Sequence, residues 1–155
     1  MTPPPFAEWL QRVIPAGGTV LDVGCGDKWY WQYINAKMIG IDAWPAFSPD
    51  YLLNLEVDDL PDVKVDAVLM ADFLEHMSKE RGKEILEQAK QRANLVMVLT
   101  PLVWSANDRA FFDKKGNYYQ DPFVFHKSLW GPADFPGFTQ VAALCPGYFH
   151  GLWRA

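Results

Sequence analysis

The stretch Val20-Leu-Asp-Val-Gly-Cys-Gly-Asp27 decides the fold of this chain. Its first four residues favour a buried β-strand, while Gly24 and Gly26 permit backbone conformations, and a close approach of a ligand, that a Cβ atom would obstruct. A helix predicted over residues 28–35 would present its unpaired N–H groups to whatever lies above the turn. Asp22 adds a carboxylate near the strand end, which suits a positively charged ligand better than a pyrophosphate. The stretch therefore predicts a ligand-binding turn.

Strands and helices alternate around this turn, and a hairpin signal at Pro146-Gly147 closes the chain. The pattern predicts strands over 20–23, 38–41, 51–55, 65–70, 95–99, 138–144 and 148–154, and helices over 6–14, 28–35, 79–92 and 129–134. Such an order is typical of an α/β three-layer sandwich. We therefore expect a seven-stranded, mostly parallel sheet whose last strand is antiparallel, with helices on both of its faces.

A length of 155 residues favours one domain over residues 1–155. It would begin with the short helix 6–14 and carry an aromatic, lid-like insertion at 102–129, because a connection of that length is usually functional. Seven Trp, six Tyr and ten Phe make up 15% of the chain, and many of them lie in this insertion. They would either line a pocket or form the interface of a homodimer.

Charge and cysteine content narrow the class of protein. The net charge of −5 and the pI of about 5.1 argue against a nucleic-acid partner. No window approaches the roughly 18 apolar residues of a membrane span, and the first residues do not form a signal peptide. Cys25 and Cys145 lie far apart without a metal-type spacing. These features predict a cytoplasmic protein with two reduced thiols.

Polar side chains follow the strands at their carboxyl ends, where open α/β sheets bind their ligands. Asp42 closes the second strand and is placed to accept hydrogen bonds from both hydroxyls of a ribose. A dinucleotide is the rival ligand, but its glycine motif requires a third glycine where Trp29 stands. The first turn and Asp42 therefore favour a nucleoside-containing ligand without a pyrophosphate.

With these residues laid out, the chain resembles the class I S-adenosylmethionine-dependent methyltransferases over about residues 18–154. Residues 20–26 look like the family's glycine-rich first motif, and Gly40-Ile-Asp42 looks like its second. Asn54-Leu-Glu-Val-Asp-Asp-Leu-Pro61 stands where the family contacts adenine, and residues 65–76 are similar to its fourth-strand signature ending in Leu-Glu-His. The four motifs occur in the family's order.

The resemblance implies that the cofactor is S-adenosylmethionine. The sequence departs from the family's pattern at two places. Asp27-Lys28-Trp29 replaces a third glycine, so we expect Trp29 to approach the cofactor. Asn54 stands where an acidic residue is frequent. Asp22 would face the cofactor's amino group. The cofactor-binding residues implied are Asp22, Gly24, Cys25, Gly26, Trp29, Asp42, Ala43, Asn54, Leu55 and Ala71.

Catalytic candidates follow the fourth strand. His76 is either a general base, since its usual pKa near 6.5 suits proton removal, or a residue that holds the loop together with Glu75. Asp72 is the second candidate for a catalytic role. Glu75, His76 and Asp72 offer metal-type ligands, but no second cluster stands at ligand spacing, so we expect no metal site. Candidate substrate contacts are Phe73, Thr100, His126 and Trp130.

The sequence thus predicts a methyltransferase that acts on a small-molecule or glycan-type acceptor, because His126, Ser128 and Trp130 recur in similar form in such members of the family. Its alternative is a non-catalytic partner or regulatory subunit that binds S-adenosylmethionine. A nucleic-acid acceptor is disfavoured by the acidic charge and by Ala71-Asp-Phe-Leu74, which stands where nucleic-acid methyltransferases carry Asn-Pro-Pro-Tyr.

Overall fold

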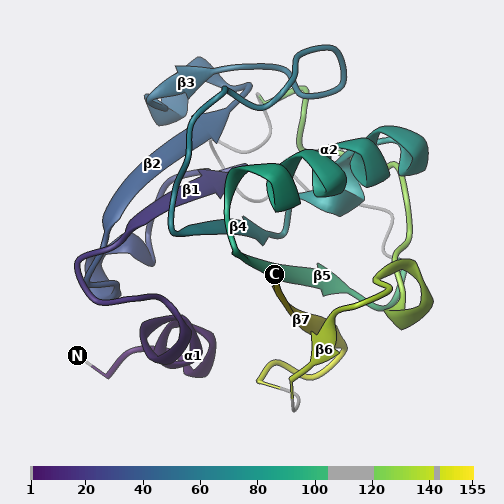
Figure 1. Cartoon of the computed structure of the whole chain (residues 1–155). Helices are drawn as coiled ribbons and strands as arrows, with labels where there is room; N and C mark the ends of the chain where they lie inside the picture. The colour runs from purple at the N-terminus through teal and green to yellow at the C-terminus, as the bar shows by residue number, and fades with distance from the viewer. Residues whose placement is uncertain (1, 105–120, 142–143) are drawn as a thin grey trace.

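The computed structural model describes residues 2–104, 121–141 and 144–155. Its strands form one seven-stranded sheet in the order β3-β2-β1-β4-β5-β7-β6 (Figure 1). The strand bounds are β1 Thr19–Val23, β2 Lys37–Asp42, β3 Tyr51–Leu52, β4 Ala67–Ala71, β5 Leu95–Pro101, β6 Thr139–Gln140 and β7 Tyr148–Arg154.

The pairing of the strands confirms the predicted α/β sheet. β1 lies between β2 and β4 and is parallel to both, while β3 and β5 extend the parallel part on its two sides. β7 pairs antiparallel with β5 and with the short edge strand β6. The carboxyl ends of β1, β2, β3 and β4 therefore meet at one edge of the sheet.

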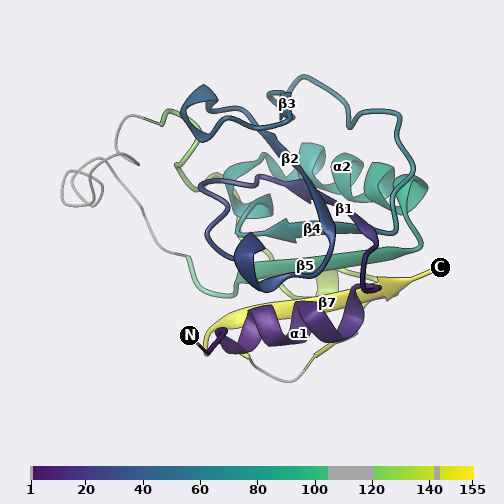
Figure 2. The same ribbon diagram turned by 90° about the vertical axis from the view of Figure 1, so that its left-hand side faces the viewer.

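The two α-helices that the structure describes cover opposite faces of this sheet, as Figures 1 and 2 show. α1 (Pro5–Val13) packs on the face formed by residues such as Leu69 and Met97. α2 (Lys79–Arg92) packs on the face formed by their neighbours Val68 and Val96. Successive side chains of a strand point to opposite faces, so the aliphatic runs of β4 and β5 supply both layers of the core. The predicted three-layer sandwich is confirmed.

α2 follows the helix predicted over 79–92, and its N-terminus is held by a side chain from another segment. Ser78 occupies the N-cap position without a side-chain capping bond. Its backbone N–H and hydroxyl instead donate to the two carboxylate oxygens of Glu56, at 2.6 and 3.1 Å. Glu56 therefore ties the start of α2 to the loop that follows β3.

The helix predicted over 28–35 is wrong: the described chain there contains only a 3₁₀-helix, η1 (Trp31–Tyr33). Gly26 and Lys28 both have positive φ, at 51° and 62°, which the α-helix does not allow. Tyr30 and Trp31 both donate to Oδ2 of Asp22, at 2.7 and 2.6 Å. Consecutive residues point to different sides of an α-helix, so this shared contact requires an irregular chain.

Three further elements are shorter than predicted. β3 stops at Leu52 because Asn54 begins a turn, in which its carbonyl accepts the N–H groups of Val57 and Asp58. β6 comprises two residues, and the predicted helix over 129–134 is reduced to η5 (Pro132–Asp134), which begins at a proline. Most of the predicted insertion 102–129, and with it Phe111, Phe112, Tyr118 and Tyr119, lies outside the described residues. No helix among the described residues is long and apolar enough to span a membrane.

We predict that Gly82→Ala destabilises the protein although alanine favours helices by about 1 kcal/mol. A Cβ atom at Gly82 in α2 would lie 2.5 Å from Cζ2 of Trp130, which is 1% exposed. Overpacking of this kind costs about 1–3 kcal/mol, measurable by urea unfolding. Lys83→Ala, at the exposed next position, is the control and should change the unfolding free energy by less than about 0.5 kcal/mol. A Gly82→Ala protein as stable as this control would contradict the packing.

Candidate functional site

A cavity that opens to solvent lies at the carboxyl ends of the parallel strands. One side of it is formed by the turn after β1 and by residues that end or follow β2 and β3. The other side is formed by the segment after β4 and by residues 121–127. The lining residues used below are Gly24, Gly26, Asp42, Ala43, Asn54, Leu55, Glu56, Asp72, Phe73, His76, Asp121, Phe123, Val124 and Lys127.

The glycine turn supports one wall of the cavity. Gly24 and Gly26 have φ of 75° and 51°, and the N–H groups of Gly24 and Cys25 both donate to the carbonyl of Ile41. A Cβ atom at Gly24 would lie 2.6 Å from Cδ2 of Phe73, whereas one at Gly26 would meet no atom within 4 Å. The conformation thus favours glycine at both positions, and the space requires it at Gly24.

Asp42 ends β2 with its carboxylate on the cavity. Its Oδ2 accepts the N–H of Gly26 at 3.0 Å, and its Oδ1 accepts the N–H of Trp44 at 2.9 Å. Each ionised oxygen can accept a second hydrogen bond. The two backbone donors therefore fix the orientation of a carboxylate that can still accept from a pair of neighbouring hydroxyls.

Asp22 lies beneath the turn rather than on the cavity. Its side chain is fully buried, and burial raises its pKa to about 6 although the bonds from Trp31 and Tyr30 lower it. Its other oxygen, Oδ1, has no hydrogen-bond partner among the described residues. Cys25 is buried beside it, and burial raises the pKa of its thiol to about 12. Both residues support the turn from below.

The walls of the cavity carry more acidic than basic side chains. Asp42, Glu56, Asp72 and Asp121 line it, and Lys127 is the one lysine or arginine among its described lining residues. The Nζ of Lys127 lies 3.8 Å from Glu56, which leaves the other three carboxyl groups without a lysine or arginine partner within the described chain. The cavity therefore favours a cationic ligand.

Asp72 and Glu75 form a pair of carboxyl groups after β4. Burial raises the pKa of Asp72 to about 6. Burial, and then the charge of Asp72, raise the pKa of Glu75 well above its usual value. The hydroxyl of Thr100 donates to Oε2 of Glu75 at 3.3 Å. Thr100 is fully buried, so its described contact supports Glu75.

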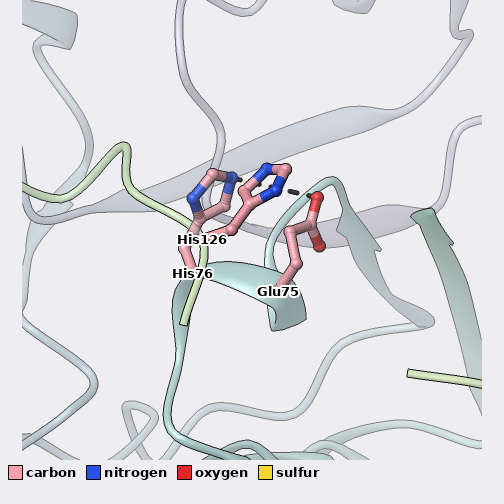
Figure 3. A group of neighbouring side chains, drawn as sticks. All are labelled: Glu75, His76 and His126. Atoms are coloured by element: carbon pink, nitrogen blue, oxygen red, sulfur yellow. Dashed lines mark ion pairs between the residues drawn. The ribbon is translucent and has the colours of Figure 1, made fainter. Parts of the chain in front are cut away.

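Glu75 and His76 meet His126, which approaches from a segment distant in the sequence (Figure 3). The Nε2 of His76 lies 3.8 Å from Oε1 of Glu75, and the two imidazole rings lie 4.9 Å apart between centroids. Burial, and then His126, lower the pKa of His76 to about 4, so that His76 is neutral at pH 7. One ligand atom from each of the three residues lies within 4.8 Å of the others.

With this geometry established, comparisons with known proteins place the fold. No family model matches the chain, and no curated protein does. Among solved structures, the DhpI-SAM-HEP complex aligns with a TM-score of 0.69 at 16% identity and covers 97% of this chain and 85% of that one. The chain has the fold of the class I S-adenosylmethionine-dependent methyltransferases.

Two other solved structures show how widely this methyltransferase fold is shared. CalO1, a methyltransferase in calicheamicin biosynthesis, aligns with a TM-score of 0.60 at 17% identity over 94% of this chain and 52% of that one. A protein from Rhodobacter sphaeroides described as a candidate zinc-dependent alcohol dehydrogenase aligns with a TM-score of 0.69 at 10% identity, over 96% and 88%. At such identities the likeness concerns the fold, and the ligand must be argued from the site.

In this methyltransferase fold the predicted site residues divide into two groups. The cavity is lined by Gly24, Gly26, Asp42, Ala43, Asn54, Leu55, Asp72, Phe73 and His76. Outside the lining lie Asp22, Cys25, Trp29, Ala71, Thr100, His126 and Trp130.

Two tryptophans show why some of these residues lie outside it. Trp29, with Gly26 and Lys28 in left-handed conformations before it, turns away from the cavity and packs against Phe6 of α1. Trp130 is buried and donates to the carbonyl of Leu74 at 3.0 Å. Both therefore contribute to packing in the structure.

Phe123 is one of the insertion's aromatic residues for which a pocket was an alternative, whereas the sequence does not single out the lining residues Glu56, Asp121, Val124 and Lys127 as site residues. Glu56 lies inside the stretch 54–61, which stands where the methyltransferase family contacts adenine, so the resemblance could have pointed to it. The others belong to the C-terminal part of the predicted insertion 102–129, and no local pattern places them individually at the ends of strands far away in the sequence.

We predict that Asp22→Asn removes part of the pH dependence of stability. The folded-state pKa of about 6 exceeds the ordinary value of 3.8, so protonation of Asp22 favours the folded protein. This contribution is complete below pH 4 and is lost as the pH rises through about 6. At about 1.36 kcal/mol for each unit of pKa, the loss is about 3 kcal/mol.

Urea unfolding at several pH values measures this effect. Between pH 4 and pH 7 the unfolding free energy of the wild type should fall relative to that of Asp22→Asn. Asp62→Asn, at an exposed side chain, is the control and should follow the wild type. Parallel pH profiles for the wild type and Asp22→Asn would contradict a pKa of Asp22 raised by burial.

Proposed function

We propose that this protein is an S-adenosylmethionine-dependent methyltransferase that acts on a small-molecule or glycan-type acceptor. The observation that carries the proposal is a cavity with a glycine wall, a fixed carboxylate at Asp42 and an excess of acidic side chains. Solved structures of the same fold, DhpI with SAM and CalO1 with SAH, support it.

The residues present fit this cofactor. Gly26 offers bare backbone beside open space, which suits the methionine portion, and Asp42 is oriented to accept from the two ribose hydroxyls. Ala43, Asn54 and Leu55 line the neighbouring wall, where adenine would lie. When bound there, S-adenosylmethionine supplies an electrophilic methyl group on a positively charged sulfur.

The charges argue against the rival dinucleotide. A pyrophosphate is stabilised by N–H groups at the start of a helix, and the chain after the glycine turn is not an α-helix. The carboxyl groups of Asp42, Asp72 and Asp121, which have no lysine or arginine partner among the described residues, would repel phosphates and attract a sulfonium and an ammonium group. The missing helix N-terminus and the acidic cavity both disfavour a pyrophosphate, and the acidic cavity also favours the cationic cofactor.

The wall beyond the cofactor would orient the acceptor. Asp72, Phe73 and His76 line this wall, and the neutral imidazole of His76 can accept a hydrogen bond from an acceptor hydroxyl. Positioning an acceptor contributes up to roughly 7–11 kcal/mol, whereas a general base adds a rate factor of about 10²–10⁴. We therefore propose that Asp72 and His76 act first by orientation and then by receiving the proton that the hydroxyl loses.

A panel of ligands tests the cofactor. S-adenosylmethionine and S-adenosylhomocysteine should raise the melting temperature in a thermal-shift assay, since a ligand at about 100 times its Kd adds roughly 2.7 kcal/mol. NAD and NADP are the comparison ligands and should leave it unchanged. A shift with the dinucleotides alone would overturn the proposal.

Asp42→Asn should weaken the binding of S-adenosylmethionine by about 10- to 100-fold, because hydrogen bonds to a charged group contribute about 1.5–3 kcal/mol. Isothermal titration calorimetry measures this change, with circular dichroism to establish that the variant is folded. Asp62→Asn is the control, because it makes the same substitution at an exposed aspartate outside the cavity, and it should bind S-adenosylmethionine like the wild type. Equal affinity in folded Asp42→Asn would remove Asp42 from the site.

Formation of S-adenosylhomocysteine tests the acceptor class. Hydroxylated small molecules and sugars should support it, and RNA should not, because the cavity is acidic. Binding of the cofactor without turnover on any acceptor would favour the alternative of a non-catalytic, cofactor-binding partner.

A further inference from the structure

We propose that Glu75, His76 and His126 bind one divalent transition-metal ion at the acceptor side of the cavity. The three side chains offer one carboxylate oxygen and two imidazole nitrogens, all within 4.8 Å of one another. Metal–ligand bonds of about 2.0–2.2 Å place neighbouring ligand atoms about 3–4 Å apart. The 3.8 Å between Oε1 of Glu75 and Nε2 of His76 already lies in this range.

The hydrogen bonding of His76 points to a cation in the cluster. Its Nδ1 lies 3.4 Å from the carbonyl oxygen of Phe125, and a carbonyl can only accept, so Nδ1 carries the proton. The lone pair on Nε2 then lies on the side of the ring that is closest to Oε1 of Glu75. A metal ion could lie between these two acceptors, and a protonated Nδ1 held by a backbone carbonyl is a common arrangement of metal-binding histidines.

The cluster is held together by the chain around it. The N–H groups of Lys127 and Ser128 donate to the carbonyl of Glu75, at 2.7 and 3.2 Å, and fix the backbone next to His126. The hydroxyl of Ser128 donates to the carbonyl of Met77 at 2.7 Å. The hydroxyl of Thr100 donates to the carboxylate of Glu75 and orients it from behind. Such outer contacts are those that orient metal ligands.

Glu75 and Asp72 place two carboxyl groups together in a buried site. Glu75 is 3% exposed and lies in hydrogen-bonding contact with a second carboxyl group, Asp72. Within the described residues no lysine or arginine forms an ion pair with either, and the nearby Lys127 pairs with Glu56. Burial of two carboxyl groups is costly without a proton or a cation, and a metal ion supplies the cation.

The ligand set indicates the class of metal. Two imidazoles and one carboxylate suit Zn²⁺, Fe²⁺ or Co²⁺, whereas Mg²⁺ and Ca²⁺ favour oxygen ligands. Three protein ligands leave a position open for a further ligand. His76 lines the cavity, so this open position would face the acceptor.

The consequence for the reaction rests on the function proposed above. An acceptor that offers an oxygen to the open position would be held and polarised by the ion, which makes its hydroxyl more acidic. With Nε2 of His76 on the metal, Asp72 is the neighbouring cavity group that would receive the proton. We therefore assign the acceptor to compounds with a hydroxyl that can bind a metal ion.

Metal titration tests the site without any acceptor or cofactor. Protein stripped with a chelator should bind one Zn²⁺ per chain by calorimetry and should give visible absorption bands of a nitrogen-bound ion with Co²⁺. His126→Ala should lower the Zn²⁺ affinity at least tenfold. Asp121→Asn, at a cavity carboxyl group outside the cluster, is the matched control and should retain it.

Absence of Zn²⁺ binding and of a Co²⁺ spectrum in the wild type, or an unchanged affinity in His126→Ala, would overturn the proposal. If circular dichroism shows that His126→Ala is unfolded, His76→Gln is the second ligand variant, with the same expected loss. The two proposals fail separately: Asp42→Asn should lose S-adenosylmethionine and keep Zn²⁺, while His126→Ala should lose Zn²⁺ and keep S-adenosylmethionine. Metal binding without cofactor binding would retain the metal site and reject the methyltransferase.

Discussion

The fully buried carboxylate of Asp22 is the contact on which the candidate site depends. Asp22 lies in β1 and accepts hydrogen bonds from Tyr30 and Trp31. These two residues belong to the connection between β1 and β2, which contains no α-helix. Because both donors meet one oxygen, the chain after Gly26 is drawn back under the glycine turn. The turn is thereby fixed against β2, where Gly26 reaches Asp42. The burial that raises the pKa of Asp22 is the cost of this arrangement.

The sheet could be predicted from the sequence because its information is local. Aliphatic runs such as Leu95–Leu99 are buried on both faces, and the alternation of elements specifies a parallel order. The connection 24–36 could not be predicted in this way. Its aromatic residues are spaced as in a short helix, but a contact with Asp22 and two positive φ values override that preference.

In the candidate site, too, one part could be predicted from the sequence and the other could not. The cofactor side follows directly from residues that end strands, so Gly24, Gly26 and Asp42 were found in the sequence and line the cavity. The acceptor side is formed where residues 121–127 return to the segment after β4. His126 reaches Glu75 and His76 because its neighbours bond to the carbonyl of Glu75, a pairing across a long separation that no spacing in the sequence reveals.

The central claim is that one cavity holds the cofactor on Asp42 and presents the acceptor to Asp72 and His76. A crystal structure of the complex with S-adenosylhomocysteine tests it most directly. The account predicts the ribose hydroxyls on the carboxylate of Asp42 and the sulfur directed toward the side of the cavity formed by Asp72 and His76. A ligand bound elsewhere, or one whose sulfur points away from that side, would contradict it.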